Sequence, residues 1–266
     1  MKRLLPLLAA AALIAVPAAG ATSSSSPPVH QKGKLIVAFG DAAPGFAAGH
    51  LRGTNITNPK GYEVDLAKDV AKALKLTPVW KYSPWTGLFA PGNKKFDISF
   101  QEATITAQRA KKVDFTKSYM NANQGVLLSK KAPKVKTLAQ LKQLQTCAQA
   151  DTTGLQYIDD QLKPTKRPLT YPTTTAAYQA VANGTCQAFV LDVPLILLQK
   201  KQTPTRFGPV EGQIITHEQY GAVLQKGSKL TPIVDRIIKR FTKNGTIAKL
   251  QKKWFKISFT KLHVFK

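Results

Sequence analysis

The chain has 266 residues, with 39 lysines and arginines against 14 aspartates and glutamates, and a formal net charge of +25. Its basic residues, such as Lys130, Lys200 and Lys252, are scattered along the sequence. Nucleic-acid binders instead concentrate positive charge on one helix or arm, often with aromatic residues between the charges. We therefore expect a solvated basic surface and no nucleic-acid partner.

The N-terminal segment has the pattern of a secretory signal. Lys2 and Arg3 precede a short apolar stretch, and small residues ending at Ala21 suit a cleavage site. The stretch is too short for a stable membrane anchor, although a retained membrane helix is the alternative. We expect residues 1–21 to be a signal peptide and residues 22–34 to be a disordered leader. The mature chain is then periplasmic or secreted, soluble, and without stable membrane insertion.

The sequence contains two cysteines, Cys147 and Cys186. An exported chain folds in an oxidising compartment, where a disulfide between them would close a loop of roughly forty residues. Two free buried thiols are the alternative, and we favour the disulfide. No nearby histidine or cysteine completes a ligand set, so we expect no metal, no cofactor and no thiol nucleophile.

Two blocks of alternating strands and helices follow the leader. The apolar run 35–39 is typical of a buried strand, and Tyr62, Leu66 and Val70 recur at the spacing of an amphipathic helix. Further strands are expected at 78–82, 96–100, 147–149 and 188–191. Further helices are expected at 138–144, 152–162, 174–182 and 233–241, with a last helix that reaches Phe255. This alternation predicts an α/β fold with βαβ units.

The two blocks are joined by an apolar segment at 125–128, and a second crossing is expected at 220–224. If the final helices return to the first block, the chain crosses between two lobes twice. Such a paired crossing leaves a cleft with a two-strand hinge. Periodicity alone does not establish this topology.

Several short motifs occur in a fixed order along most of the mature chain. They are 61–67 (GYEVDLA), 85–87 (WTG), 103–106 (ATIT), 113–115 (VDF), 151–154 (DTTG) and 189–192 (FVLD). In their order and spacing the chain resembles the periplasmic solute-binding proteins of polar amino-acid ABC importers, solute-binding protein family 3.

The resemblance implies a periplasmic-binding-protein-like clamshell. Lobe 1 is expected at 35–127 and 221–256, lobe 2 at 128–220, and a C-terminal tail at 257–266. Each lobe should be a mostly parallel sheet flanked by helices, and 50–59 should be a longer loop near the cleft mouth. The implied partners are an amino acid and the permease of an ABC transporter, with the chain a monomer.

The chemistry of an α-amino acid indicates which residues should hold it. Burial of its carboxylate and ammonium requires an opposite charge and hydrogen bonds on each. Arg109 offers a planar fork for the carboxylate, the task of the family's arginine at this position, with an exposed helical arginine as the alternative. Asp192 matches the family's acidic position and can accept the ammonium, with a helix N-cap ahead of Pro194 as the alternative.

Four further residues complete the expected contacts around the ligand's polar groups. Thr152 and Thr153 lie where a strand turns into a helix, a place that favours an anion, with ordinary N-capping as the alternative. Thr104 can hydrogen-bond either charged group, and Gln149 ends a predicted strand nearby. Trp85 aligns with an aromatic residue that stacks on the ligand side chain, although such a tryptophan alone is more often core.

Departures from the family pattern bear on specificity. Ala43 stands where many relatives place a second aromatic residue, so the aromatic sandwich is either open on one side or filled by Phe46. Asp41, Glu102 and Asp151 add acidic groups near the expected cleft. If they face it, a cationic side chain would find partners at short range, which favours a basic amino acid.

The same fold is also used by enzymes, and the alternative function is a cyclohexadienyl-dehydratase-like enzyme. Catalysis would need a positioned acid or base in the cleft, and Glu102 or Asp151 is the candidate. Nothing in the sequence marks either carboxyl as tuned for this role. We therefore expect a binding protein that is not an enzyme.

Overall fold

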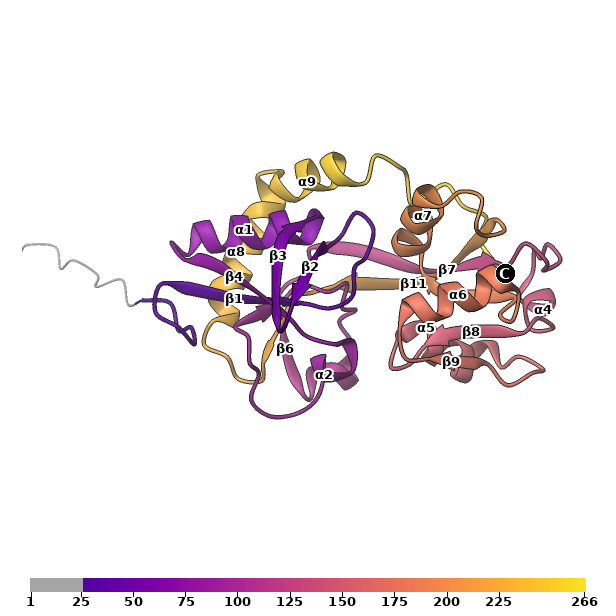
Figure 1. The fold of residues 1–266 in the computed structure, drawn as a ribbon, viewed down its shortest axis with the longest axis horizontal. Coiled ribbons are helices and arrows are strands. Elements are labelled where there is room, and N and C mark those ends of the chain that lie inside the picture. Colours follow the sequence, from indigo (N-terminus) through magenta and orange to yellow (C-terminus); the bar gives the residue numbers. More distant parts are fainter. Residues whose placement is uncertain (1–25) are drawn as a thin grey trace, which may run out of the picture.

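The computed structural model describes residues 26–266, so the predicted signal peptide (1–21) lies outside the described residues. Two α/β lobes lie side by side along the long axis of the molecule (Figure 1). One lobe is built on a 7-stranded sheet and the other on a 5-stranded sheet. The two-lobed α/β architecture predicted from the sequence is confirmed.

The sheet of lobe 1 has the strand order β2-β3-β4-β1-β5-β12-β6. Its strands are β1 (Lys34–Phe39), β2 (Ala48–Arg52), β3 (Asn55–Lys60), β4 (Thr77–Tyr82), β5 (Ile98–Ser99), β6 (Val113–Phe115) and β12 (Val223–Gln225). Its helices are α1 (Tyr62–Ala73), α2 (Trp85–Leu88), α3 (Ala107–Ala110), α8 (Thr231–Lys243) and α9 (Thr246–Trp254). Strand β1 is parallel to β4 and β5, and the other neighbours are antiparallel.

The sheet of lobe 2 has the order β11-β7-β10-β8-β9. Its strands are β7 (Met120–Leu128), β8 (Thr146–Gln149), β9 (Leu169–Tyr171), β10 (Ala188–Asp192) and β11 (Val210–Tyr220). Its helices are α4 (Leu138–Leu141), α5 (Thr153–Tyr157), a π-helical turn (Ile158–Leu162), α6 (Thr174–Asn183) and α7 (Val193–Gln202). Both sheets are mixed, where mostly parallel sheets were predicted, because a hairpin and strands returning from the other lobe add antiparallel pairs.

Helix α1 shows how the sequence pattern builds the core of lobe 1. Tyr62, Leu66 and Val70 are fully buried, as their i+4 spacing predicts. The helix begins directly after Gly61, whose φ is 138°. A side chain there would place its Cβ 2.0 Å from the carbonyl oxygen of Phe46. Only glycine therefore permits this close approach of the helix start to the preceding loop.

Strands β7 and β11 join the two lobes as an antiparallel pair (Figure 1). Met120 and Ala122 at the start of β7 are buried in the core of lobe 1, together with Tyr220 at the end of β11. Val126 and Leu128 farther along β7 are buried in the core of lobe 2. Each strand is thus anchored in both lobes, which is the arrangement of a two-strand hinge.

The segment 50–59 was predicted to be a loop and instead contributes to the hairpin of β2 and β3. Leu51 pairs with Ile56, and Ile56 is buried beneath the hairpin. Gly53 closes the turn with a φ of 60°, a conformation that glycine adopts without strain. One buried residue and one turn glycine therefore suffice to order a segment that looks polar in the sequence.

The described part of the leader is more ordered than predicted, and the C-terminal tail packs on both lobes. At the N-terminal end, the backbone N–H of His30 donates to Asp97 Oδ1 at 2.7 Å, so the described part of the leader is tied to lobe 1. At the other end, residues 257–266 form a C-terminal strap that runs from lobe 1 to lobe 2 (Figure 1). Phe259 packs on Phe255 in lobe 1, and Phe265 is buried in the core of lobe 2.

Backbone hydrogen bonds fix the end of the C-terminal strap to strand β11. Gln213 donates to the carbonyl of His263 at 2.7 Å, and Phe265 donates to the carbonyl of Gln213 at 2.9 Å. A side chain at Gly212 would lie 2.7 Å from that His263 carbonyl, so glycine gives the strap room. The strap is therefore a third connection between the lobes, added to the two hinge strands.

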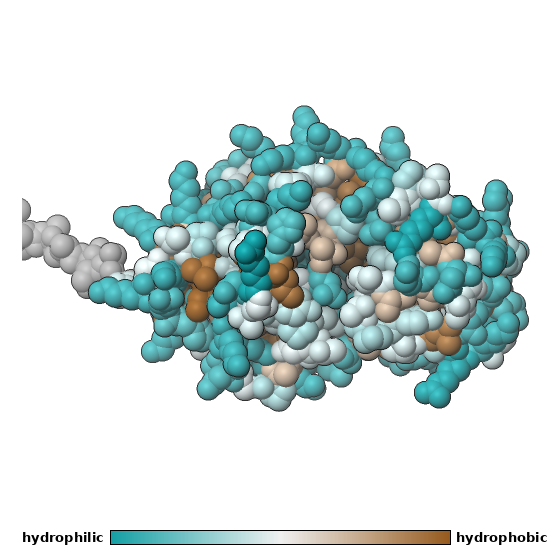
Figure 2. Space-filling model, in the orientation of Figure 1, coloured by the Kyte–Doolittle hydropathy of each residue, from teal (hydrophilic) through white to brown (hydrophobic). Residues whose placement is uncertain are grey.

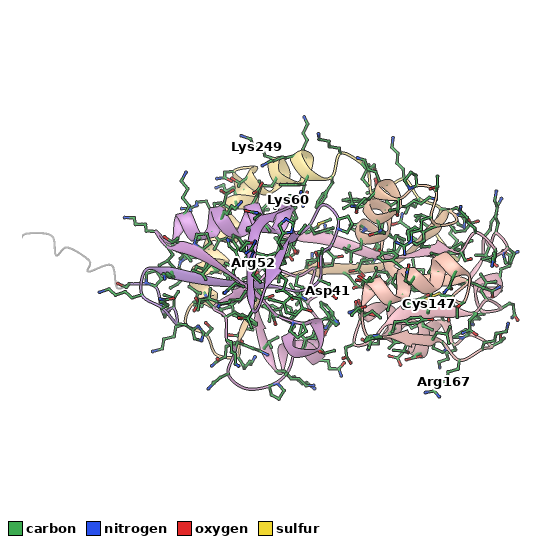
Figure 3. The ribbon with its side chains drawn as sticks, in the orientation of Figure 1. Asp41, Arg52, Lys60, Cys147, Arg167 and Lys249 are labelled. Atoms are coloured by element: carbon green, nitrogen blue, oxygen red, sulfur yellow. A yellow bond between two sulfur atoms is a disulfide. The ribbon has the colours of Figure 1, made fainter. Side chains whose placement is uncertain are left out.

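The surface matches the high charge of the sequence. Hydrophilic side chains cover most of the face in Figure 2, and a furrow runs between the two lobes. Lys249 on α9 and Arg167 on lobe 2 point outward from the molecule (Figure 3). Within residues 26–266, no helix is long and apolar enough to cross a membrane.

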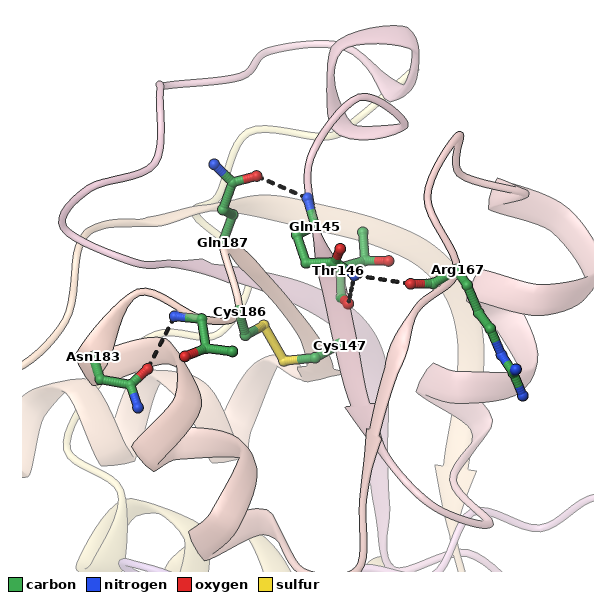
Figure 4. Close-up of a disulfide and its surroundings, with 8 residues drawn as sticks. Gln145, Thr146, Cys147, Arg167, Asn183, Cys186 and Gln187 are labelled. Atoms are coloured by element: carbon green, nitrogen blue, oxygen red, sulfur yellow. Dashed lines mark hydrogen bonds between the residues drawn. A yellow bond between two sulfur atoms is a disulfide. The ribbon is translucent and has the colours of Figure 1, made fainter.

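The predicted disulfide is confirmed. Cys147 of β8 is bonded to Cys186, which lies just before β10, with a Cα–Cα distance of 5.8 Å (Figure 4). Both residues are fully buried, packed with Ala177 and Phe189 in a core cluster of lobe 2. The bond therefore ties together two parallel neighbours of the lobe 2 sheet.

Candidate functional site

A cavity lies between the two lobes, and the empty space within it and at its open mouth amounts to about 750 Å³. All but one of the predicted ligand residues line it: Asp41, Trp85, Glu102, Thr104, Arg109, Gln149, Thr152, Thr153 and Asp192. In Figure 3, Asp41 lies on the side of lobe 1 that faces lobe 2. The structure therefore gathers residues from both lobes around one space.

Arg109 enters the cavity from α3, a short helix of lobe 1. The helix begins where the Thr106 side chain accepts a hydrogen bond from the backbone of Arg109 at 3.1 Å. The guanidinium carbon lies 4.2 Å from the ring centre of Phe89 and 5.1 Å from that of Trp85. This stacking fixes the plane of the guanidinium group.

The Arg109 guanidinium also connects the two lobes. It donates to the carbonyl of Thr104 in lobe 1 and to the carbonyl of Asp151 in lobe 2, each at 2.9 Å. Burial lowers its pKa to about 10, opposed by the charges of Asp192, Glu218 and Asp151. The group therefore stays cationic at neutral pH and can offer its remaining donors to an anion.

Asp192 faces the cavity from the end of β10 in lobe 2. It begins helix α7 but makes no side-chain capping bond, so the N-cap alternative does not account for its carboxylate. The carboxylate instead accepts from the Tyr220 hydroxyl at 2.5 Å and from the Gln124 amide. Burial, and then the charge of Glu218, raises the pKa of Asp192 to about 7. A cation that binds beside this carboxyl stabilises its ionised form.

Glu218 and Gln124 of the hinge strands bind residues that line the cavity, and neither was predicted from the sequence. One Glu218 oxygen accepts from the hydroxyls of Thr104 and Thr153, both at 2.7 Å, and so joins the lobes. Its other oxygen accepts from the Gln124 amide at 2.9 Å. Both residues lie just outside the predicted crossing segments, so their polar side chains gave no signal in the sequence.

The two threonines of lobe 2 have different roles. The Thr152 side chain accepts a hydrogen bond from the backbone N–H of Leu155 at 3.2 Å, so it caps helix α5. Ordinary N-capping, the alternative considered for this residue, is therefore present. The Thr153 hydroxyl instead donates to Glu218. Gln149 lines the cavity and donates to the carbonyl of Pro172 at 3.3 Å.

Phe46 does not line the cavity, contrary to the prediction that it fills the place of a second aromatic residue. It is completely buried in lobe 1, with its ring centre 4.9 Å from that of Phe255. Ala43 and Pro44 line the cavity instead, and the aromatic residues of its lining are Trp85 and Tyr178. Of the two alternatives for the aromatic sandwich, the one in which Phe46 fills it is therefore wrong.

Two acidic residues of lobe 1, Asp41 and Glu102, line the cavity. Asp41 is exposed and accepts from the Tyr82 hydroxyl at 3.0 Å. Glu102 lies deeper, and its Oε1 is buried without a hydrogen-bond partner among residues 26–266. Asp151 lines a neighbouring surface pocket instead and reaches the site through its backbone carbonyl.

The described geometry is that of a two-lobed ligand-binding protein, with a cation and a carboxylate from opposite lobes facing one cavity. The sequence model of the bacterial extracellular solute-binding proteins, family 3, matches residues 35–257. The chain belongs to this family.

Named relatives agree with this assignment. The chain is 27% identical over 237 residues to the L-cystine-binding protein TcyJ of Escherichia coli (strain K12), covering 88% of this chain and 86% of TcyJ. Among solved structures, an ancestral arginine-binding protein bound to arginine has a TM-score of 0.75 and 28% identity, over 85% of this chain and all of that one.

A second solved structure relates to the alternative function. The ancestral amino acid-binding protein AncCDT-1, a precursor of cyclohexadienyl dehydratase, has a TM-score of 0.72 and 31% identity, over 84% of this chain and 95% of that one. This precursor is itself described as an amino acid-binding protein. The named relatives are thus binding proteins, in agreement with the expectation that this chain is not an enzyme.

Proposed function

We propose that the chain captures a polar amino acid between its two lobes and delivers it to an ABC importer. The observation that carries this proposal is the placement of Arg109 from lobe 1 and Asp192 from lobe 2 around one cavity. An α-amino acid carries a carboxylate and an ammonium a short distance apart. The cleft supplies a partner of opposite charge for each, which burial of both charges requires.

In the proposed complex, Arg109 holds the ligand carboxylate, while Asp192 and the Thr104 hydroxyl oxygen accept from the ammonium. Trp85 contacts the side chain of the ligand from lobe 1. Because Arg109 already contacts lobe 2 through the Asp151 carbonyl, a ligand bound at this group is enclosed by both lobes. The ligands printed in the names of the relatives, cystine and arginine, are amino acids and support this class of solute.

A thermal-shift screen tests the proposal. The mature chain, refolded to remove any bound ligand, is heated with each common amino acid and with non-amino-acid solutes of similar size. A ligand at one hundred times its dissociation constant stabilises the native state by about 2.7 kcal/mol, a readily measured shift. We expect a clear shift with one chemical class of amino acid. Absence of a shift with every amino acid would contradict the proposal, and turnover of prephenate or arogenate would favour the enzyme.

A further inference from the structure

Glu102 is held in the cavity wall by an unusual backbone conformation. Its φ is 46°, in the left-handed region that glycine adopts readily and other residues adopt at a cost. Its side chain lines the cleft cavity. Its Oε1 is buried without a hydrogen-bond partner in the described part of the chain. A buried carboxylate oxygen in this state destabilises the protein unless a proton or a ligand satisfies it.

Glu63 of helix α1 lies directly behind Glu102. Its Oε1 accepts the backbone N–H of Glu102 at 2.9 Å and the hydroxyl of Tyr119. Glu63 is only 1% exposed, and its Oε2 has no partner within residues 26–266. Two carboxyl groups therefore lie together inside lobe 1, and one of them opens onto the cavity. We call them the Glu63–Glu102 pair.

The charges that act most strongly on Glu102 are negative. Burial, and then the charge and hydrogen bonding of Glu63, raises its pKa, and Asp192 adds to this effect. Burial also raises the pKa of Glu63. The other titratable groups around the pair are Tyr62, Tyr119, Tyr178 and Tyr220, with Asp41 and Arg109 on the cavity wall. The pair therefore retains a proton at neutral pH.

We propose that Glu102 selects ligands whose side chain ends in a cation, and that the Glu63–Glu102 pair releases a proton to solvent when that cation binds. The inference rests on the proposed function and names its substrate class. A guanidinium or ammonium group supplies the positive charge that the two carboxyl groups lack, and its binding at Glu102 favours loss of the shared proton. Glu63 is then a positioning residue, since it holds the backbone of Glu102 and shares its proton.

The lining of the cavity agrees with this assignment. It includes Asp41 as well as Glu102, together with the small residues Ala43 and Pro44. A cationic side chain therefore finds two carboxyl groups in the lining of the cavity. Its α-carboxylate and α-ammonium are still free to meet Arg109 and Asp192.

Calorimetric titration with a matched ligand pair tests the inference. L-arginine and L-citrulline have the same shape, but the end group of citrulline is uncharged. We expect the ligand-stripped protein to bind arginine at least about thirtyfold more tightly than citrulline. In Glu102→Gly the affinities for arginine and citrulline should differ by no more than about threefold, mainly because arginine binds more weakly. Glycine suits the φ of this position, so the variant should fold at least as stably as the parent.

A control variant and a proton count separate Glu102 from general effects. Lys75→Gly places glycine at another left-handed position, with a φ of 58°, on the exposed end of α1, and should leave both affinities unchanged. Titrations in phosphate and in Tris at pH 7 give the number of protons released. Arginine should release more protons than citrulline in the parent protein, and the excess should disappear in Glu102→Gly and in Glu63→Gln.

The outcomes distinguish this inference from the proposed function. Binding of neutral amino acids in preference to arginine and lysine would overturn the inference and leave amino-acid capture standing. Equal losses for arginine and citrulline in Glu102→Gly would place Glu102 on the α-ammonium, and would also overturn it. A protein that binds no amino acid would overturn the proposed function and the inference together.

Discussion

Replacement of Arg109 by alanine removes the group on which the proposed site depends most. The guanidinium stacks on Phe89 and Trp85 and donates to carbonyl oxygens of Thr104 and Asp151. The alanine variant loses the cation that faces the ligand carboxylate. It also loses the one hydrogen bond by which this side chain holds lobe 2 against lobe 1.

The size of the expected effect follows from burial. Removal of one partner of a buried, hydrogen-bonded charge pair costs about 2–5 kcal/mol, because the other charge remains desolvated. This range corresponds to a loss of affinity of about thirtyfold to several thousandfold. The stacked position and the lowered pKa of Arg109, about 10, show that the group is desolvated, so a surface-like effect below 1 kcal/mol is not expected.

Calorimetric titration of the parent and variant proteins measures this loss directly. Arg206→Ala is a matched control, since this exposed arginine also stacks on an aromatic ring, that of Phe207, but lies outside the cavity. The control should bind with the parent's affinity. Arg109→Lys should fall between the two, because lysine keeps the charge but not the planar fork. An affinity of Arg109→Ala within threefold of the parent would refute the assignment.

Three further predictions concern other parts of the molecule. Asp192 has a pKa raised to about 7, and an ammonium ligand binds its ionised form, so affinity should fall by up to about tenfold per pH unit below 7 and lose this slope in Asp192→Asn. Replacement of Cys147 and Cys186 by serine should lower the free energy of unfolding in urea by about 4 kcal/mol, as expected for a separation of 39 residues. Phe265→Ala should cost about 3–5 kcal/mol, since its ring fills the core of lobe 2, and an unchanged midpoint would show that the C-terminal strap is dispensable.

Local patterns in the sequence were sufficient for elements whose core contacts repeat along one helix or strand. The helix from Tyr62 was predictable because one face of it is buried. The placement of Arg109 and Asp192 at the cavity was predictable because both positions match motifs of the family that the sequence resembles. The disulfide was predictable from the export signal together with two cysteines in one lobe.

Contacts between distant segments explain what the sequence did not reveal. Phe46 looks available for the ligand, but three aromatic residues from other elements enclose it in the core. Glu218 gains its role only when the hinge strand brings it between Thr104 and Thr153. Phe265 lies in a tail that shows no regular pattern of a helix or strand, and the edge of strand β11 gives that tail a place to bind.

Native mass spectrometry tests the central claim most directly. The ligand-stripped mature protein is incubated with an equimolar mixture of the common amino acids, and the mass of the intact complex identifies what binds. We predict one added molecule per chain with the mass of an amino acid, absent from Arg109→Ala. A chain that stays free of every amino acid in the mixture would contradict the account.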